Sequence, residues 1–219
     1  CIGTRNGDII MPLQNRVSPN GDIIATSQRG MFMGNRGILH NDEKELVSTS
    51  KIKGWVTCRL EFKGRKRELM AKGRYTELFF FDEATAFAAG HRPCAECRRE
   101  RYKEFKSKWL EANGTLLDGD STAIGAIDKI IHAQRIHKQK KVTYQALLNS
   151  LPDGVIVTID SENYLIWKEK LFLWSFDGYK LSNLTIDDRE VSVLTPHSYV
   201  EMFKQGFVPM VHASIEELE

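Results

Sequence analysis

The chain has 219 residues and a mass of 25.0 kDa, which suits one large domain or two small ones. Hydrophobic residues make up 42% and charged residues 27% of it, so the composition is that of a folded globular protein and excludes a disordered or collagen-like chain. No stretch approaches the ~20 apolar residues of a membrane span, and the first residues lack the apolar core of a signal peptide, so we expect a cytoplasmic protein without membrane contact.

Apolar periodicity and turn residues divide the chain into three parts, which together predict an α+β fold. Residues 1–50 are polar and glycine-rich and indicate β-hairpins, with strands over 22–26 and 31–33. Residues 51–150 combine strands with most of the helices, and Asp82 is the expected N-cap of the first helix. The elements expected there are strands 55–62 and 77–81 and helices 83–89, 94–112, 121–137 and 143–151. Residues 151–219 form a small β-rich part, with strands 155–159, 164–167, 171–174 and 191–194 and a helix over 197–205.

Positive charge is concentrated in the middle of the chain, although the net charge of the whole is only +2. Residues 51–108 contain 16 Lys and Arg against 8 Asp and Glu, a local charge of +8. Such a basic stretch with interspersed aromatic residues is typical of surfaces that bind nucleic acid, although it also suits a solvated face whose Lys and Arg stems cover apolar surface. The candidate nucleic-acid contacts are Arg59, Lys63, Arg65, Lys66, Arg67, Arg74, Arg98 and Arg99.

The strongest single motif is Pro93-Cys94-Ala95-Glu96-Cys97-Arg98. Two cysteines three residues apart at the start of a helix present both sulfurs to one point, as zinc knuckles do. The alternatives are a redox pair and cysteines that merely pack in the core, and the βαβ context of thioredoxins is missing. Four cysteines in the whole chain are too few for a secreted disulfide framework. The motif therefore predicts a Zn²⁺ site.

Zinc takes four ligands, or three and a water molecule. Cys58, on the preceding strand, is the expected third ligand. The fourth position is open between His40 and His91, with Cys1 as a weaker candidate. If the protein offers no fourth ligand, the open position suits a catalytic site.

The stretch from Phe79 to Arg98 resembles the end of the metal-binding domain of the Ada alkylation-response proteins. That domain ends in two aromatics, an alanine-rich helix, a glycine and Arg-Pro-Cys-x-x-Cys-Arg; the resemblance covers residues 55–102. It implies a zinc ion held by four cysteines, one of which accepts a methyl group from DNA, and so a role in DNA repair or modification. By this resemblance Cys94 and Cys97 match the second ligand pair and Cys58 the methyl acceptor. The other cysteine of the family falls at Phe62, which cannot bind a metal. The rest of the chain resembles uncharacterised bacterial proteins.

We therefore expect a zinc-binding protein that contacts DNA, with RNA as the other partner. The alternative is an enzyme that processes damaged or modified nucleic acid, with Cys58, Glu61 and Glu77 as candidate catalytic residues. A nuclease would hold Mg²⁺ on carboxylates beside a lysine, and the candidates for this are Glu61, Lys63, Glu77, Asp82 and Glu83. A permuted zinc deaminase would use His132 and Gln134 in place of a His-x-Glu motif, although a glutamine cannot shuttle protons. A glycosylase is the third possibility.

Overall fold

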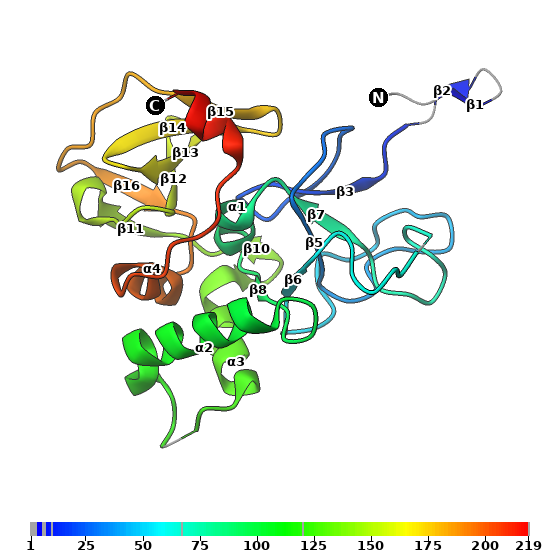
Figure 1. The fold of residues 1–219 in the computed structure, drawn as a ribbon, viewed down its shortest axis with the longest axis horizontal. Coiled ribbons are helices and arrows are strands. Elements are labelled where there is room, and N and C mark those ends of the chain that lie inside the picture. Colours follow the sequence, from blue (N-terminus) through cyan, green and yellow to red (C-terminus); the bar gives the residue numbers. More distant parts are fainter. Residues whose placement is uncertain (1–3, 6–7, 10, 67, 120, 219) are drawn as a thin grey trace.

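The computed structural model describes residues 4–5, 8–9, 11–66, 68–119 and 121–218 and confirms the α+β fold class. Two six-stranded sheets lie on either side of the short helix α1, and the longer helices α2 and α3 gather at one end of the molecule (Figure 1). Within the described part of the chain, no helix combines the length and apolar character needed to cross a membrane.

The first sheet has the strand order β4-β3-β7-β5-β6-β8. Most neighbours are antiparallel, but β3 runs parallel to β7 and β6 runs parallel to β8. Residues alternate between the two faces of these strands, and the inward ones, among them Val17, Phe32, Leu78 and Phe80, form one apolar cluster. The strands are β3 Gln14–Val17, β4 Ile23–Ala25, β5 Phe32–Asn35, β6 Val56–Cys58, β7 Leu78–Phe80 and β8 Arg92–Pro93.

The second sheet is the antiparallel meander expected near the C-terminus, with the order β11-β16-β12-β13-β14-β15. Two-residue turns join β12 to β13 and β13 to β14, and their residues have positive φ angles, as tight hairpins require. The strands are β11 Tyr144–Leu147, β12 Ile156–Ile159, β13 Glu162–Trp167, β14 Lys170–Ser175, β15 Gly178–Leu181 and β16 Glu190–Val193. Small separate hairpins are formed by β1 Thr4–Arg5 with β2 Asp8–Ile9, and by β9 Ile136–His137 with β10 Lys140–Lys141.

The core consists of three apolar clusters, and helix α1, Glu83–Ala88, contributes side chains to each of them. Ala86 packs with the first sheet, Ala84 and Ala88 with the second sheet, and Phe87 with the longer helices. Asp82 caps the helix as expected, because its Oδ1 accepts a hydrogen bond of 2.8 Å from the backbone N–H of Thr85. The other α-helices are α2 Arg99–Asn113, α3 Ile124–Arg135 and α4 His197–Lys204. The short 3-10 helices are η1 Gly114–Leu116, η2 Leu148–Ser150 and η3 Ala213–Leu218.

Three expectations from the sequence need correction. The helix expected over 143–151 is wrong: β11 pairs with β16, and only η2 is helical there. The helix expected over 94–112 begins at Arg99, so the two cysteines lie in the turn before it. The strand expected over 55–62 ends at Cys58 and is followed by a long loop.

The expected domain boundaries at residues 50 and 150 each fall within a sheet, because strands from both sides of the boundary pair with each other. Strand β5 pairs with β6 across the first boundary, and β11 pairs with β16 across the second. The polar N-terminal part therefore belongs to the same sheet as the strand that carries Cys58.

Candidate metal centre

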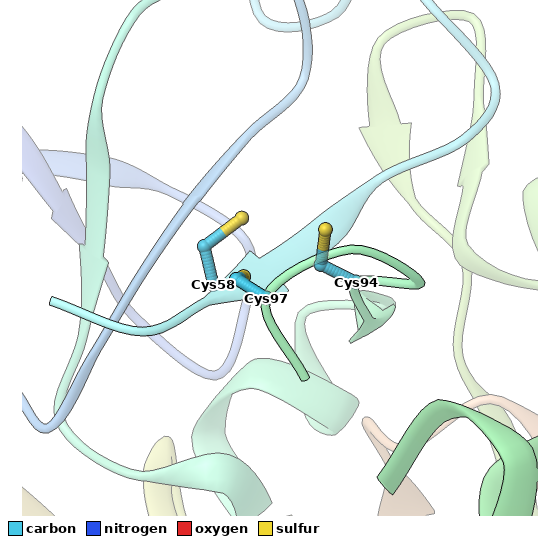
Figure 2. Close-up of side chains that lie close together, drawn as sticks. All are labelled: Cys58, Cys94 and Cys97. Carbon is cyan, nitrogen blue, oxygen red and sulfur yellow. The ribbon is translucent and has the colours of Figure 1, made fainter. Parts of the chain in front are cut away.

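Cys58, Cys94 and Cys97 are brought together by the parallel pairing of β6 and β8. The N–H of Cys94 donates to the carbonyl of Thr57 at 2.9 Å, which places Cys94 beside the end of β6. The sulfur atoms of the three cysteines all lie within 4.8 Å of one another. Figure 2 shows the side chain of Cys58 on β6 close to those of Cys94 and Cys97 in the turn that follows β8. The three ligands predicted from the sequence are thus adjacent.

The turn that carries Cys94 and Cys97 directs backbone N–H groups at the sulfur atoms. The N–H of Glu96 lies 3.4 Å from Cys94 Sγ, and the N–H of Arg98 donates to the carbonyl of Cys94 at 3.1 Å and closes the turn. The N–H of Arg59, just after β6, donates to the sulfur of Cys97. Hydrogen bonds of this kind orient thiolate ligands and stabilise their negative charge.

The pKa values of the three thiols differ because each thiol has its own hydrogen bonds and its own degree of burial. The Cys58 thiol donates a hydrogen bond to Cys94, which together with backbone N–H groups lowers the pKa of Cys94 to about 5. The same hydrogen bond, reinforced by burial, raises the pKa of Cys58 above its usual value, and burial raises that of Cys97. The cluster therefore offers one thiolate and two thiols to an incoming cation. Three sulfur donors within one small volume can hold a metal ion.

The two candidate histidines, His40 and His91, are not part of this cluster as the structure describes it. His40 is buried in hydrogen bonds elsewhere: its Nδ1 lies 2.6 Å from Thr76 Oγ1 and its Nε2 lies 3.3 Å from the Ala71 carbonyl. His91 is buried against Phe80, and its Nε2 accepts a hydrogen bond from Arg36. In the described residues no further His, Asp or Glu joins the three cysteines, and Cys1 lies outside those residues.

Most of the predicted nucleic-acid contacts are exposed near the cysteines. Arg65 connects the loop after β6 to the cysteine turn through an exposed ion pair with Glu96, at 2.8 Å. In the same loop, Lys63 and Arg65 both lie over the ring of Phe62, at 5.2 and 5.3 Å from its centroid. The exposed candidates are Arg59, Lys63, Arg65, Lys66, Arg74 and Arg99, and Arg67 lies outside the described residues.

Arg98 is the exception, because the structure removes it from the surface. Its side chain is buried, with Nη2 2.5 Å from Glu83 Oε1 and Nη1 2.7 Å from Thr57 Oγ1. A guanidinium held in this way cannot reach a phosphate. The sequence around Arg98 does not indicate that this side chain is buried, because its partner Glu83 lies on another element, α1.

A polar cavity of about 570 Å³ opens beside the loop that follows β6. Basic side chains line it together with two carboxylates, and a smaller cavity of about 140 Å³ adjoins Arg59, Phe62 and Arg65. Glu77 lines both cavities, but its Oε2 accepts a hydrogen bond of 2.8 Å from the N–H of Met70, so it also ties down the loop. The larger cavity is lined by Arg65, Lys66, Glu68, Ala71, Arg74, Tyr75 and Glu77.

The residues of the alternative enzymes are not gathered into a site. Glu61 is exposed, and the carboxylates form no group of three or more metal donors among the residues that the structure describes. His132 lies 3.0 Å from Arg135 through its Nδ1, and the side-chain oxygen of Gln134 accepts from the N–H of Ser198. Neither residue joins the cysteine cluster.

Comparison with protein-family models, curated proteins and solved structures gives no match to this chain. The case for a metal centre therefore depends on the geometry of the cysteine cluster itself.

Proposed function

We propose that this protein binds one zinc ion through Cys58, Cys94 and Cys97 and contacts DNA with the basic surface beside that centre. The observation that supports the metal most directly is the clustering of three sulfur atoms within 4.8 Å. Sulfur donors on an N–H-lined turn suit zinc better than harder cations, which prefer oxygen. A bound zinc ion would link β6 to the turn before α2 and leave room for one more ligand.

The proposed DNA contact is supported by the exposed cations next to the cysteines. Arg59 follows Cys58 directly, and the ion pair of Arg65 with Glu96 brings the basic loop against the cysteine turn. Lys and Arg side chains bind DNA chiefly through its phosphates. The resemblance to the Ada alkylation-response proteins adds the proposal that this contact serves DNA repair or modification.

Metal content tests the zinc centre. We expect about one zinc ion per chain by elemental analysis of the purified protein, and loss of the metal in the variants C58S, C94S and C97S. S107A on α2 is the control, since Ser107 is exposed and belongs to no group of metal donors, so this variant should keep the metal. A protein without zinc, or full zinc content in all three cluster variants, would contradict the proposal.

Fluorescence anisotropy with single- and double-stranded oligonucleotides tests the DNA contact. Affinity should fall steeply with salt, and the triple variant R59Q/K63Q/K66Q should reduce the slope of log affinity against log salt by about 2 to 3. K103Q/K108Q on α2 is the control, because these lysines pair with Glu100 and Glu111 on their own helix. Absent or salt-insensitive binding would contradict DNA contact without affecting the zinc centre.

A second candidate function is an enzyme that processes damaged or modified nucleic acid. It is favoured by one observation: the described residues supply three ligands, and catalytic zinc sites commonly keep one position free. In the form implied by the Ada resemblance, the Cys58 sulfur would take a methyl group from a phosphotriester, forming an S–C bond while the O–C bond breaks and a phosphodiester anion leaves. Mass spectrometry of the protein after incubation with methylated DNA would detect this; unchanged protein and unchanged DNA would argue for a binding protein.

A further inference from the structure

A second polar cavity, of about 500 Å³, lies between the first sheet and the β9–β10 hairpin. Its wall includes the residues before β4, the residue after β5, the last residue of α3 and the hairpin itself. Three of the lining residues are cationic: Arg36 after β5, Arg135 at the end of α3 and Lys141 on β10. Of the described residues that line the cavity, Asp22 is the one that is acidic, and it is exposed.

Arg36 is buried and only partly satisfied. Its Nη1 donates to the carbonyl of Gly21 at 2.9 Å, its Nε donates to His91 Nε2 at 3.3 Å, and the guanidinium lies 4.1 Å from the ring centroid of Trp55. Its Nη2 is buried with no hydrogen-bond partner. This nitrogen faces Gly21, which also lines the cavity, since a Cβ built on that glycine would lie 3.7 Å from it. One strong donor is therefore left over at the cavity wall.

Arg135, which also lines the cavity, is held in a similar way. Its two Nη atoms donate to the carbonyls of Gly90 and Lys53, at 2.7 and 2.6 Å, and its guanidinium lies 3.7 Å from the ring centroid of Trp55. Its Nε is buried without a partner. Lys141 donates to the carbonyl of Ala88. Backbone carbonyls and an indole ring fix these cations in place but do not neutralise them.

The other buried arginines have the carboxylate partners that Arg36 and Arg135 lack among the described residues. Arg92 and Arg98 are each matched to a carboxylate, Arg92 to Asp128 at 2.7 Å and Arg98 to Glu83 at 2.5 Å. Among the described residues, Arg36, Arg135 and Lys141 form no ion pair with a carboxylate. Burying cations without a counter-charge costs several kcal/mol in general, so an unmatched group at one cavity calls for an anion.

Burial, and after it the repulsion between these groups, lowers their pKa values. Burial and the neighbouring guanidiniums lower the pKa of Lys141 to about 7, and burial followed by Arg135 lowers that of Arg36 to about 9. Asp22 acts in the opposite direction on both. The adjacent His91 has a pKa well below its usual value, because it is buried beside Arg36, Arg135 and Lys141. An anion in the cavity would raise the pKa of each of these groups, because it favours their charged forms.

We propose that this cavity binds the phosphate group of a phosphorylated ligand. Arg36, Arg135 and Lys141 together with Asp22 give two net positive charges, which match a phosphate dianion. Arg guanidiniums and a lysine ammonium are the usual phosphate ligands of proteins. The cavity is also larger than a phosphate alone and falls in the range of small-molecule sites, so the phosphate would carry an organic group. None of these residues belongs to the cysteine cluster, so the site is independent of the metal centre.

Calorimetric titration of the full chain with inorganic sulfate tests the site, because sulfate keeps its charge while Lys141 titrates. We expect saturable binding below pH 7 that K141M weakens by about tenfold and D22N strengthens by about threefold. K138Q is the control, since Lys138 is exposed in the same hairpin turn and does not line this cavity. Circular dichroism would establish that each variant folds.

The pH dependence of sulfate affinity is a second test of the same site. Sulfate affinity of the parent protein should fall as the pH rises through 7 and Lys141 loses its proton, and the K141M variant should lack this step. Absence of saturable sulfate and phosphate binding would overturn the proposal. So would binding that both K141M and D22N leave unchanged, because it would lie elsewhere.

Two further pairs of probes distinguish a small phosphorylated ligand from the phosphorylated end of a nucleic acid. The first pair is a nucleoside and its 5′-monophosphate, and the second is an oligonucleotide with a 5′-hydroxyl or with a 5′-phosphate. Preference for the monophosphate over the nucleoside, lost in K141M, indicates a small phosphorylated ligand. The same preference confined to the oligonucleotide pair indicates a nucleic-acid end. No preference for the phosphorylated member of either pair would overturn the assignment.

Discussion

Arg98 Nη2 and Glu83 Oε1 lie 2.5 Å apart in the interior of the protein, and both side chains are almost completely buried. Through its other terminal nitrogen Arg98 donates to Thr57 Oγ1 on β6. One residue after Cys97, this arginine therefore joins the cysteine turn to α1 and to the strand that carries Cys58. The ion pair positions the turn, although its members bind no metal themselves.

Glu83→Gln should destabilise the protein by roughly 3 to 5 kcal/mol, because it leaves the buried Arg98 charge without a counter-ion. Urea unfolding followed by circular dichroism measures this. Glu100→Gln is the control: Glu100 pairs with Lys103 at the surface of α2 and should cost less than about 1 kcal/mol. Equal effects of the two substitutions would contradict the role given to the buried pair.

Removal of zinc by a chelator should lower the thermal stability of the protein, because the ion would join two segments distant in sequence. With free zinc at about 1,000 times the dissociation constant, bound metal contributes about 4 kcal/mol. Scanning calorimetry with and without chelator measures the difference, and C94S should show no response. Identical unfolding of the parent protein in both conditions would argue against a structural zinc ion.

Zinc affinity should weaken as the solution becomes more acidic. The raised pKa values of Cys58 and Cys97 mean that both thiols lose protons when a metal binds, so protons compete with the ion. Competition with a chromophoric chelator between about pH 6 and about pH 8 measures this. An affinity independent of pH would indicate ligands other than thiols.

Lys141 should make stability rise with pH above neutrality. Its pKa is lowered to about 7 in the folded protein, so between that value and its ordinary pKa the unfolded chain binds more protons, and folding becomes more favourable as the pH increases. The parent protein and K141M, unfolded in urea at a series of pH values, should converge as the pH rises. Parallel stability profiles would contradict the lowered pKa.

Gly90→Ala should destabilise the fold by more than about 1 kcal/mol. Gly90 has a φ of +86°, and a Cβ there would lie 2.4 Å from Cδ of the buried Arg135. Gly125→Ala is the matched control: Gly125 lies on α3 with open space around it, and alanine should stabilise that helix by up to ~1 kcal/mol. Thermal unfolding compares the two, and stabilisation by both would show that Gly90 is not constrained.

Local features were predictable from the sequence because they depend on residues close together in the chain. The cap at Asp82, the C-terminal meander and the Cys94–Cys97 pair are of this kind, and all are found. The error over 143–151 has the opposite origin. Tyr144–Leu147 forms a strand because it pairs with Glu190–Val193, and no local pattern reports a partner so far along the chain.

By itself, then, the sequence determined the α+β class, the three cysteines and the basic middle of the chain. Only the tertiary structure decided that Cys58 meets the other two, that His40 and His91 are engaged elsewhere, and that Arg98 is buried while Arg36 and Arg135 remain unmatched. The reason is physical: residue type and spacing encode local geometry, but burial and charge pairing depend on which distant segments the sheets bring together.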